Sequence, residues 1–150
     1  MPASSLDRQM SAPARVLRLR TTTDGGSRFE IEETRLGLKQ FAPPAPALSV
    51  SDPLPAHQFV VLRLPVGWRG KRHPSPARQI LFCLSGQVRV TSGIGEPICV
   101  GPGDVWLTED TTGQGHEANV VSDAPFDAAI VQFPWRPLAS AQLEAFSADV

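Results

Sequence analysis

Three things are scarce in this 150-residue sequence: cysteine, an excess of charge of one sign, and long apolar runs. Only Cys83 and Cys99 occur, each in an apolar, strand-like segment without a second Cys or a His at metal-ligand spacing. This pattern excludes a disulfide framework and a zinc ribbon, and it favours two buried free thiols. The 14 Lys and Arg against 15 Asp and Glu give a formal net charge of -1. No overall basic field therefore attracts nucleic acid or an anionic membrane.

The missing apolar runs bear on localisation. None approaches the roughly 20 residues that span a bilayer, and residues 1–20 hold scattered Arg without the apolar core of a signal peptide. We therefore expect a soluble, cytoplasmic protein that neither binds nucleic acid nor enters a membrane. A hydrophobic content of 41% in a chain of this length predicts one compact domain with a real core.

Proline and glycine, in contrast, are abundant. The 15 Pro and 12 Gly interrupt the chain every few positions and leave little room for long helices. Short apolar segments between these turns predict strands, and their spacing is typical of a sandwich or barrel. The predicted strands cover residues 28–39, 57–64, 79–84, 87–91, 97–100, 105–107, 118–121 and 126–133.

The two ends differ from this central part. Residues 1–26 contain few apolar side chains and end in a run of Thr, Asp and Gly, which predicts a flexible tail. The alternation at Val16–Arg20 predicts one edge or swapped strand within that tail. Residues 138–150, where Leu143 and Phe146 share a helical face, predict a short C-terminal helix. A barrel of residues 27–137 is expected between the two ends.

Two motifs stand out in the central part. The first contains Gly67, His73, Gln79 and Gly86, with six residues between the last two. The second consists of the Gly101–Asp104 turn and of Gly-Gln-Gly-His ending at His116. Both resemble the motifs of small single-domain cupins (RmlC-like), in a subgroup without settled activity. The resemblance covers residues 57–133 well and implies an all-β fold, an antiparallel β-barrel or double-stranded β-helix (cupin jelly roll), with its site inside the barrel.

This resemblance also indicates candidate site residues. It places His73 and His116 at ligand positions, whereas Ser75 and Gln79 stand where metal-binding cupins carry a second His and a Glu. In one alternative, His73, Gln79 and His116 bind Fe, Mn, Ni or Zn weakly, because two neutral imidazoles and an amide oxygen carry no negative charge. In another, the two histidines are metal-free catalytic acid and base groups. In a third, they are only a hydrogen-bonded pair.

Further ligand-binding candidates flank these histidines. Gln79 shares a strand face with Leu81, and its amide either contacts a ligand or is hydrogen-bonded within the protein and orients the histidines. Ser75 is a further ligand-binding candidate. Glu109 and Thr111 lie just before the second motif and could provide a base or hydrogen bonds at the barrel mouth. Their alternative role is to build an ordinary turn.

One tryptophan leads to an expectation about oligomeric state. Trp106 has the strand parity opposite to Val105 and Leu107, so it faces outward if those two fill the core. The strand at Val16–Arg20 has no obvious partner in the series. A bare indole and a bare strand edge both favour burial against a second copy, so we expect a homodimer.

Two classes of function follow. The first is an enzyme acting on a small organic molecule, of the dioxygenase, isomerase or lyase type that the cupin resemblance implies. The second is a non-catalytic small-molecule binding or sensor module. The sequence contains no attached helix-turn-helix pattern, which disfavours a one-chain transcription factor.

Overall fold

The computed structural model describes residues 2–134, so the helix expected at residues 138–150 lies outside the described residues. The chain divides into two compact units. Among the described residues, the larger unit contains 17–31 and 55–134 and carries the candidate site, and the smaller contains 2–16 and 32–54. No helix within residues 2–134 combines the length and the apolarity that a membrane crossing needs.

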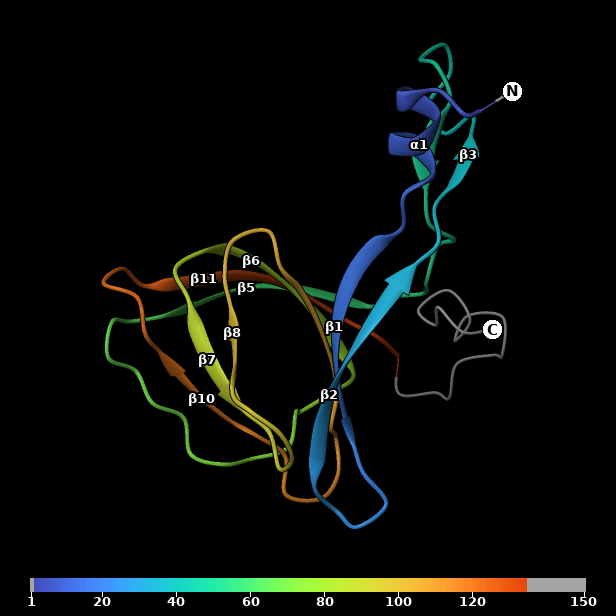
Figure 1. Ribbon diagram of the computed structural model, residues 1–150. Coiled ribbons are helices and arrows are strands. Elements are labelled where there is room, and N and C mark those ends of the chain that lie inside the picture. The colour runs from blue at the N-terminus through green and yellow to red at the C-terminus, as the bar shows by residue number, and fades with distance from the viewer. Residues whose placement is uncertain (1, 135–150) are drawn as a thin grey trace. The chain divides into compact units, whose positions relative to one another are not determined.

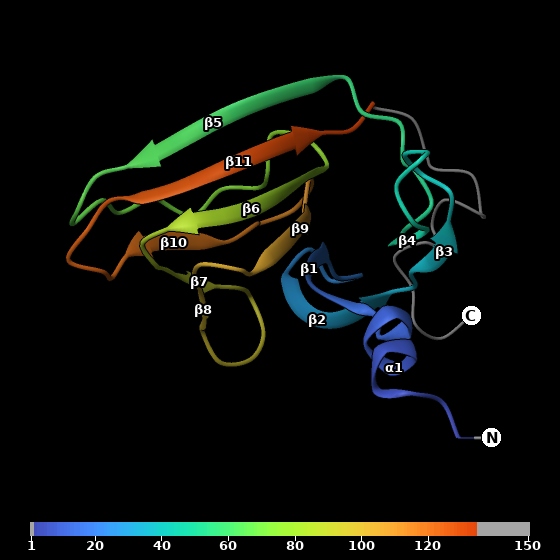
Figure 2. The ribbon, with the colours of Figure 1, turned by 90° about the horizontal axis from the view of Figure 1, so that it is seen from above.

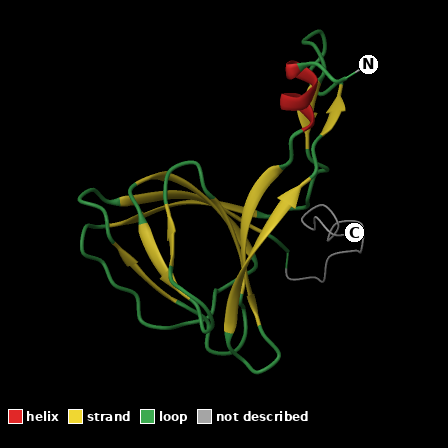
Figure 3. Ribbon diagram, viewed as in Figure 1, coloured by secondary structure: helices red, strands yellow, loops and turns green. Residues whose placement is uncertain are grey.

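Strands dominate both units (Figures 1 and 3). The first elements are α1 (Ser5–Ser11), β1 (Ala14–Thr21), β2 (Ser27–Thr34), β3 (Gly37–Lys39), β4 (Leu48–Val50) and β5 (Gln58–Leu64). They are followed by β6 (Gln79–Ser85), β7 (Val88–Thr91), β8 (Ile98–Val100), β9 (Val105–Glu109), β10 (Glu117–Val120) and β11 (Phe126–Gln132). The strands predicted between residues 57 and 133 are therefore confirmed, with small shifts at their ends.

Two sheets build the larger unit. A six-stranded sheet has the order β2-β1-β9-β6-β11-β5, and a three-stranded sheet has the order β10-β7-β8. Figure 2 shows β5, β11 and β6 running side by side, as their register requires. The mostly-β prediction is confirmed. The two sheets are hydrogen-bonded separately, so within the described residues the structure is a β-sandwich and closure into a barrel is not shown. In the smaller unit, β3 and β4 pair with each other.

The core lies between the two sheets and follows the two-residue period of the strands. Along β11, Phe126, Ala128 and Ile130 are buried, whereas the residues between them are partly exposed. Val88 and Val90 of β7 are buried in the same alternation. These inward-facing side chains belong to one hydrophobic cluster. Three of them, Val88, Phe126 and Ile130, also line the cavity of the candidate site.

The N-terminal segment differs from the predicted flexible tail. Residues 5–11 form α1. Ser4 is the N-cap of this helix, and Ser4 and Asp7 form a reciprocal capping box. β1 is not an edge strand without a partner, because it lies between β2 and β9 and pairs with β9 in parallel. Leu17 and Leu19 point into the core, and Arg18 forms an ion pair with Glu109. The strand was visible in the sequence, but its partner lies almost 90 residues away.

The second cysteine also differs from expectation. Both cysteines are free, and Cys83 is buried as predicted, but Cys99 is exposed. Burial, followed by the nearby charge of Asp104, raises the pKa of the Cys83 thiol to about 11. Cys83 therefore stays a neutral thiol near pH 7 and is a poor nucleophile.

The core position of β1 gives a stability prediction. Leu19 is 0% exposed, so Leu19→Ala should lower the free energy of unfolding by about 2–5 kcal/mol, as for other buried leucines. The matched control is Ile31→Ala on β2, where the side chain is 61% exposed and the change should stay within about 0.5 kcal/mol. Urea unfolding measures both, and equal small losses would mean that β1 is not part of the core.

Candidate functional site

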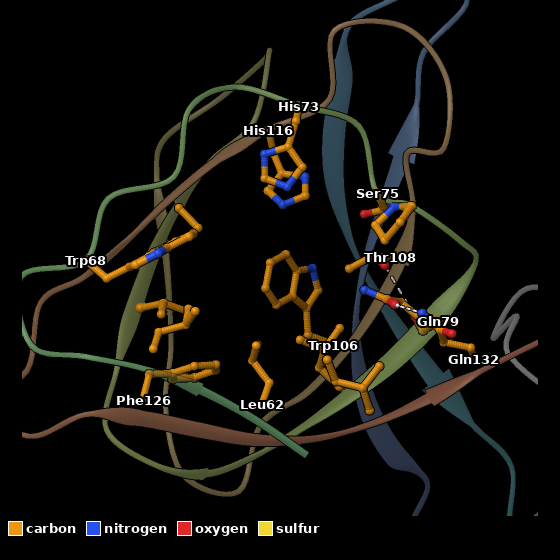
Figure 4. Close-up of a pocket in the computed structure, with 16 residues that line it drawn as sticks. Leu62, Trp68, His73, Ser75, Gln79, Trp106, Thr108, His116, Phe126 and Gln132 are labelled. Atoms are coloured by element: carbon orange, nitrogen blue, oxygen red, sulfur yellow. Dashed lines mark hydrogen bonds between the residues drawn. The ribbon is translucent and has the colours of Figure 1, made fainter. Parts of the chain in front are cut away.

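A cavity of about 330 Å³ opens between the two sheets of the larger unit (Figure 4). Most of its wall is apolar, and it is formed by Leu62, Leu64, Trp68, Pro76, Leu81, Val88, Trp106, Ala118, Phe126 and Ile130. The polar side chains that line it are His73, Ser75, Gln79, Thr108, His116 and Gln132. The cavity thus combines an apolar body with a few polar groups, which is the usual composition of a small-molecule site.

The two candidate histidines are brought together by their backbones. His73 and His116 form an antiparallel bridge in which each N–H donates to the carbonyl of the other at 3.0 Å. Gly115 permits this approach, because a Cβ at this position would lie 2.0 Å from the His73 carbonyl oxygen and because its φ is +72°. The imidazole centroids are 5.2 Å apart. Both imidazoles line the same cavity, and Gln79 lines it as well.

Behind His116 lies the buried carboxylate of Asp110. Asp110 is 0% exposed, and its Oδ2 lies 2.6 Å from His116 Nδ1. Its other oxygen, Oδ1, accepts a hydrogen bond from Ser75 Oγ at 2.7 Å. Asp110 follows β9 directly, where a short polar residue reads as an ordinary turn builder. Only its burial beside the imidazole distinguishes it, and no spacing in the sequence indicates that burial.

In the neutral form of each imidazole, these contacts determine which ring nitrogen carries the proton. Asp110 as a carboxylate can only accept, so His116 Nδ1 donates to it. His73 Nδ1 lies 2.6 Å from the Lys71 carbonyl oxygen, which also can only accept. In both rings the proton therefore sits on Nδ1 and the lone pair on Nε2. His116 is 5% exposed, whereas His73 is an exposed residue. The site thus has one enclosed base and one in contact with solvent.

Trp106 faces the cavity, which corrects the predicted outward orientation. Its register partner is Leu81, and the two side chains line the cavity on the same face. Strand alternation did not predict this orientation, because Leu107 on the other face of β9 is also fully buried. With both faces of a strand covered, apolar neighbours do not identify the inner one. The Trp106 and His116 rings meet edge to face with centroids 5.5 Å apart.

The homodimer was expected from an outward Trp106 and an unpartnered Val16–Arg20 strand. The structure removes both grounds, since Trp106 is inside and β1 is paired within the chain. The dimer stays a prediction without support from these two features.

Gln79 forms a second polar group, on a wall apart from the histidines (Figure 4). Its Oε1 accepts a hydrogen bond from Gln132 Nε2 at 3.0 Å, and the two residues are cross-strand neighbours on β6 and β11. Thr108 Oγ1 contacts the Gln79 backbone carbonyl at 3.5 Å. Gln79 Nε2 has no acceptor among the described residues.

The two remaining candidates are not brought to the cavity. Glu109 alternates with the inward-facing Thr108, so its carboxylate lies on the other face of β9, paired with Arg18 and Arg78. Thr111 is exposed in the turn after β9 and does not line the cavity. Of the six candidate residues only His73, Ser75, Gln79 and His116 do so.

The donor set does not fit a resident divalent metal. Two imidazole Nε2 atoms are available, but Gln79 Oε1 is bonded to Gln132 and Asp110 is bonded to Ser75 and His116. Among the described residues, no three His, Cys, Asp or Glu side chains group as metal ligands. Protein metal centres of this kind use at least three protein ligands. The weak metal site of His73, Gln79 and His116 is therefore not supported by the geometry.

No family model and no curated protein sequence matches this chain. It is similar to the structure of a conserved protein of unknown function from Streptococcus pyogenes, with 24% identity over 52% of this chain and 65% of the other and a TM-score of 0.37. It is also similar to the DMSP lyase DddQ from Ruegeria pomeroyi, with 19% identity over 93% of this chain and 53% of the lyase and a TM-score of 0.43.

A third similar structure is a predicted oxalate decarboxylase from Thermotoga maritima, with 18% identity over 89% of this chain and 100% of the other and a TM-score of 0.39. The chain spans about half the length of the lyase, and the chemistry of its site follows from its own residues.

The close approach at Gly115 gives a prediction with an internal comparison. Gly115→Ala should lower the free energy of unfolding by more than about 3 kcal/mol, because the new Cβ collides with the His73 backbone. Gly103→Ala is the matched control: its φ of +89° is as unfavourable, but nothing lies within 4 Å, so the cost should be about 1–2 kcal/mol. Urea unfolding gives both values. Equal losses of unfolding free energy in the two variants would contradict the close backbone approach of residue 115 to His73.

The Asp110 contact gives a second prediction, on the His116 tautomer. Long-range ¹H–¹⁵N spectra at mildly alkaline pH should show His116 with its proton on Nδ1. In Asp110→Asn the amide NH₂ can face the ring, and the proton should move to Nε2, as when a catalytic dyad loses its carboxylate. His73, held by Lys71, is the internal control and should keep its tautomer. A neutral wild-type His116 with its proton on Nε2 would contradict the hydrogen bond from His116 Nδ1 to Asp110.

Proposed function

We propose that this cupin-like protein binds a small organic molecule in the cavity between its sheets and transfers a proton on it, in a reaction of the isomerase or lyase type. The observation that supports this most is the buried pair of Asp110 and His116, whose Nε2 carries the lone pair. A carboxylate behind an imidazole holds its orientation and stabilises the imidazolium that forms when Nε2 takes a proton. Both reaction types need only a proton acceptor and a proton donor.

The two histidines have different surroundings, which suits different roles. His116 is enclosed, touches Trp106 edge to face, and is the candidate base for the bound molecule. His73 is exposed and lies beside it, and its Nε2 can exchange protons with water. In the proposed step, Nε2 of His116 accepts a proton from a carbon of the ligand, and the C–H electrons stay on the ligand. The proton then returns to a second carbon, or a leaving group departs with the electron pair.

The alternative is a binding or sensor module. The amide pair of Gln79 and Gln132 favours it, because these groups can hold a ligand and have no acid or base function. Both alternatives use the same cavity, so they differ in turnover and not in binding.

Deuterium incorporation distinguishes them. Small cyclic ketones that bind the cavity are incubated with the protein in D₂O, and mass spectrometry follows exchange beside the carbonyl. Wild type should accelerate exchange, and His116→Asn should reduce the enzymatic rate by about 100-fold or more, the usual effect of losing a general base, while binding changes little. Exchange should persist with a chelator present. Binding without exchange would support the sensor alternative.

A cavity variant provides the control for location. Ala118 on β10 lines the cavity, so Ala118→Phe should fill it and abolish binding. Ala129 lies on the face of β11 that points away from the cavity, so Ala129→Phe should retain binding. Equal binding by both variants would place the ligand elsewhere and contradict the proposed site.

A further inference from the structure

The indole N–H of Trp106 is a buried donor without a partner. Trp106 is 4% exposed, and its Nε1 makes no hydrogen bond in the described structure. Buried polar groups are nearly always hydrogen-bonded, and leaving one unpaired costs about 1–3 kcal/mol. An indole nitrogen can only donate, so the missing partner must be an acceptor.

This donor belongs to the cavity. Trp106 lines it, and in Figure 4 the nitrogen edge of its indole faces the side where Thr108 and Gln79 are drawn. The Thr108 hydroxyl is directed to the Gln79 backbone, and none of these groups accepts from the indole. A bound molecule is the acceptor that this arrangement lacks. Gln79 Nε2 is a second donor that lines the same space and has no acceptor among the described residues.

The charge of the wall restricts the ligand further. None of the side chains that line the cavity is Asp, Glu, Lys or Arg. A buried carboxylate, that of Asp110, lies directly behind His116, and its negative charge disfavours an anion in the cavity. Ten lining residues are apolar, and a volume of about 330 Å³ is at the small end of ligand sites. A mainly apolar molecule of about ten non-hydrogen atoms suits such a space.

We infer that the ligand is an uncharged, mainly apolar carbonyl compound whose oxygen accepts a hydrogen bond from Trp106 Nε1. This inference rests on the proposed function and gives its substrate class. A carbonyl oxygen has two lone pairs, so it can serve the donors of Trp106 and Gln79 together. The same oxygen gains negative charge when His116 takes a proton from the adjacent carbon: the C–H electrons form a C=C bond and the C=O π electrons move to oxygen. A fixed donor at that oxygen stabilises the enolate.

Four probes with one carbon skeleton test the class: 1-indanone, 1-indanol, indane and indane-1-carboxylate. Calorimetry with the full chain should rank 1-indanone first, and the Trp106 Nε1–H resonance should shift downfield only with probes that carry an acceptor. Trp106→Phe removes the N–H but keeps an aromatic ring, and it should weaken 1-indanone about 5- to 10-fold relative to indane.

Trp68→Phe is the matched control, because Trp68 also lines the cavity but is not among the residues with a buried unpartnered nitrogen. It should weaken 1-indanone and indane by the same factor. A 1-indanone to indane ratio that Trp106→Phe leaves unchanged would overturn the inference while the cavity still binds. Tighter binding of 1-indanol or of the carboxylate would also overturn it. Binding of no probe would overturn the proposed function as well.

Discussion

The backbone bridge between His73 and His116 is the contact on which the site depends. It joins two segments 43 positions apart (116 minus 73) and places both imidazoles at one cavity. Its two hydrogen bonds require Gly115, because a side chain there would occupy the space of the His73 carbonyl. The glycine before the second histidine therefore has a steric role and not only a conformational one.

Ser75 and Gln79, the two residues that differ from the metal-binding cupin pattern, both hydrogen-bond to other side chains of the protein. Ser75, where such cupins have a second imidazole, donates to Asp110 and helps to hold the carboxylate that orients His116. Gln79, where they have a carboxylate, pairs with Gln132. Each replacement gives a side chain that hydrogen-bonds another protein group. The polar side chains of the site are thereby held by hydrogen bonds within the protein.

The sequence predicted the strands and the convergence of the histidines well, because both depend on local patterns and on motif spacing. It failed where a side chain's surroundings come from remote elements. Trp106 lies on a strand with both faces covered, so alternation did not show its direction. β1 finds its partner β9 almost 90 residues away. Asp110 resembles a turn residue until its burial against His116 is known.

Because Trp106 faces inward, the cavity contains hydrogen-bond donors as well as acceptors. The two histidines present lone pairs, since their protons are held by Asp110 and Lys71. Trp106 and Gln79 present N–H groups instead. A carbonyl compound matches this division, because its oxygen needs a donor and its adjacent C–H needs an acceptor. An outward Trp106 would have left the cavity with the base but without the buried donor for the oxygen.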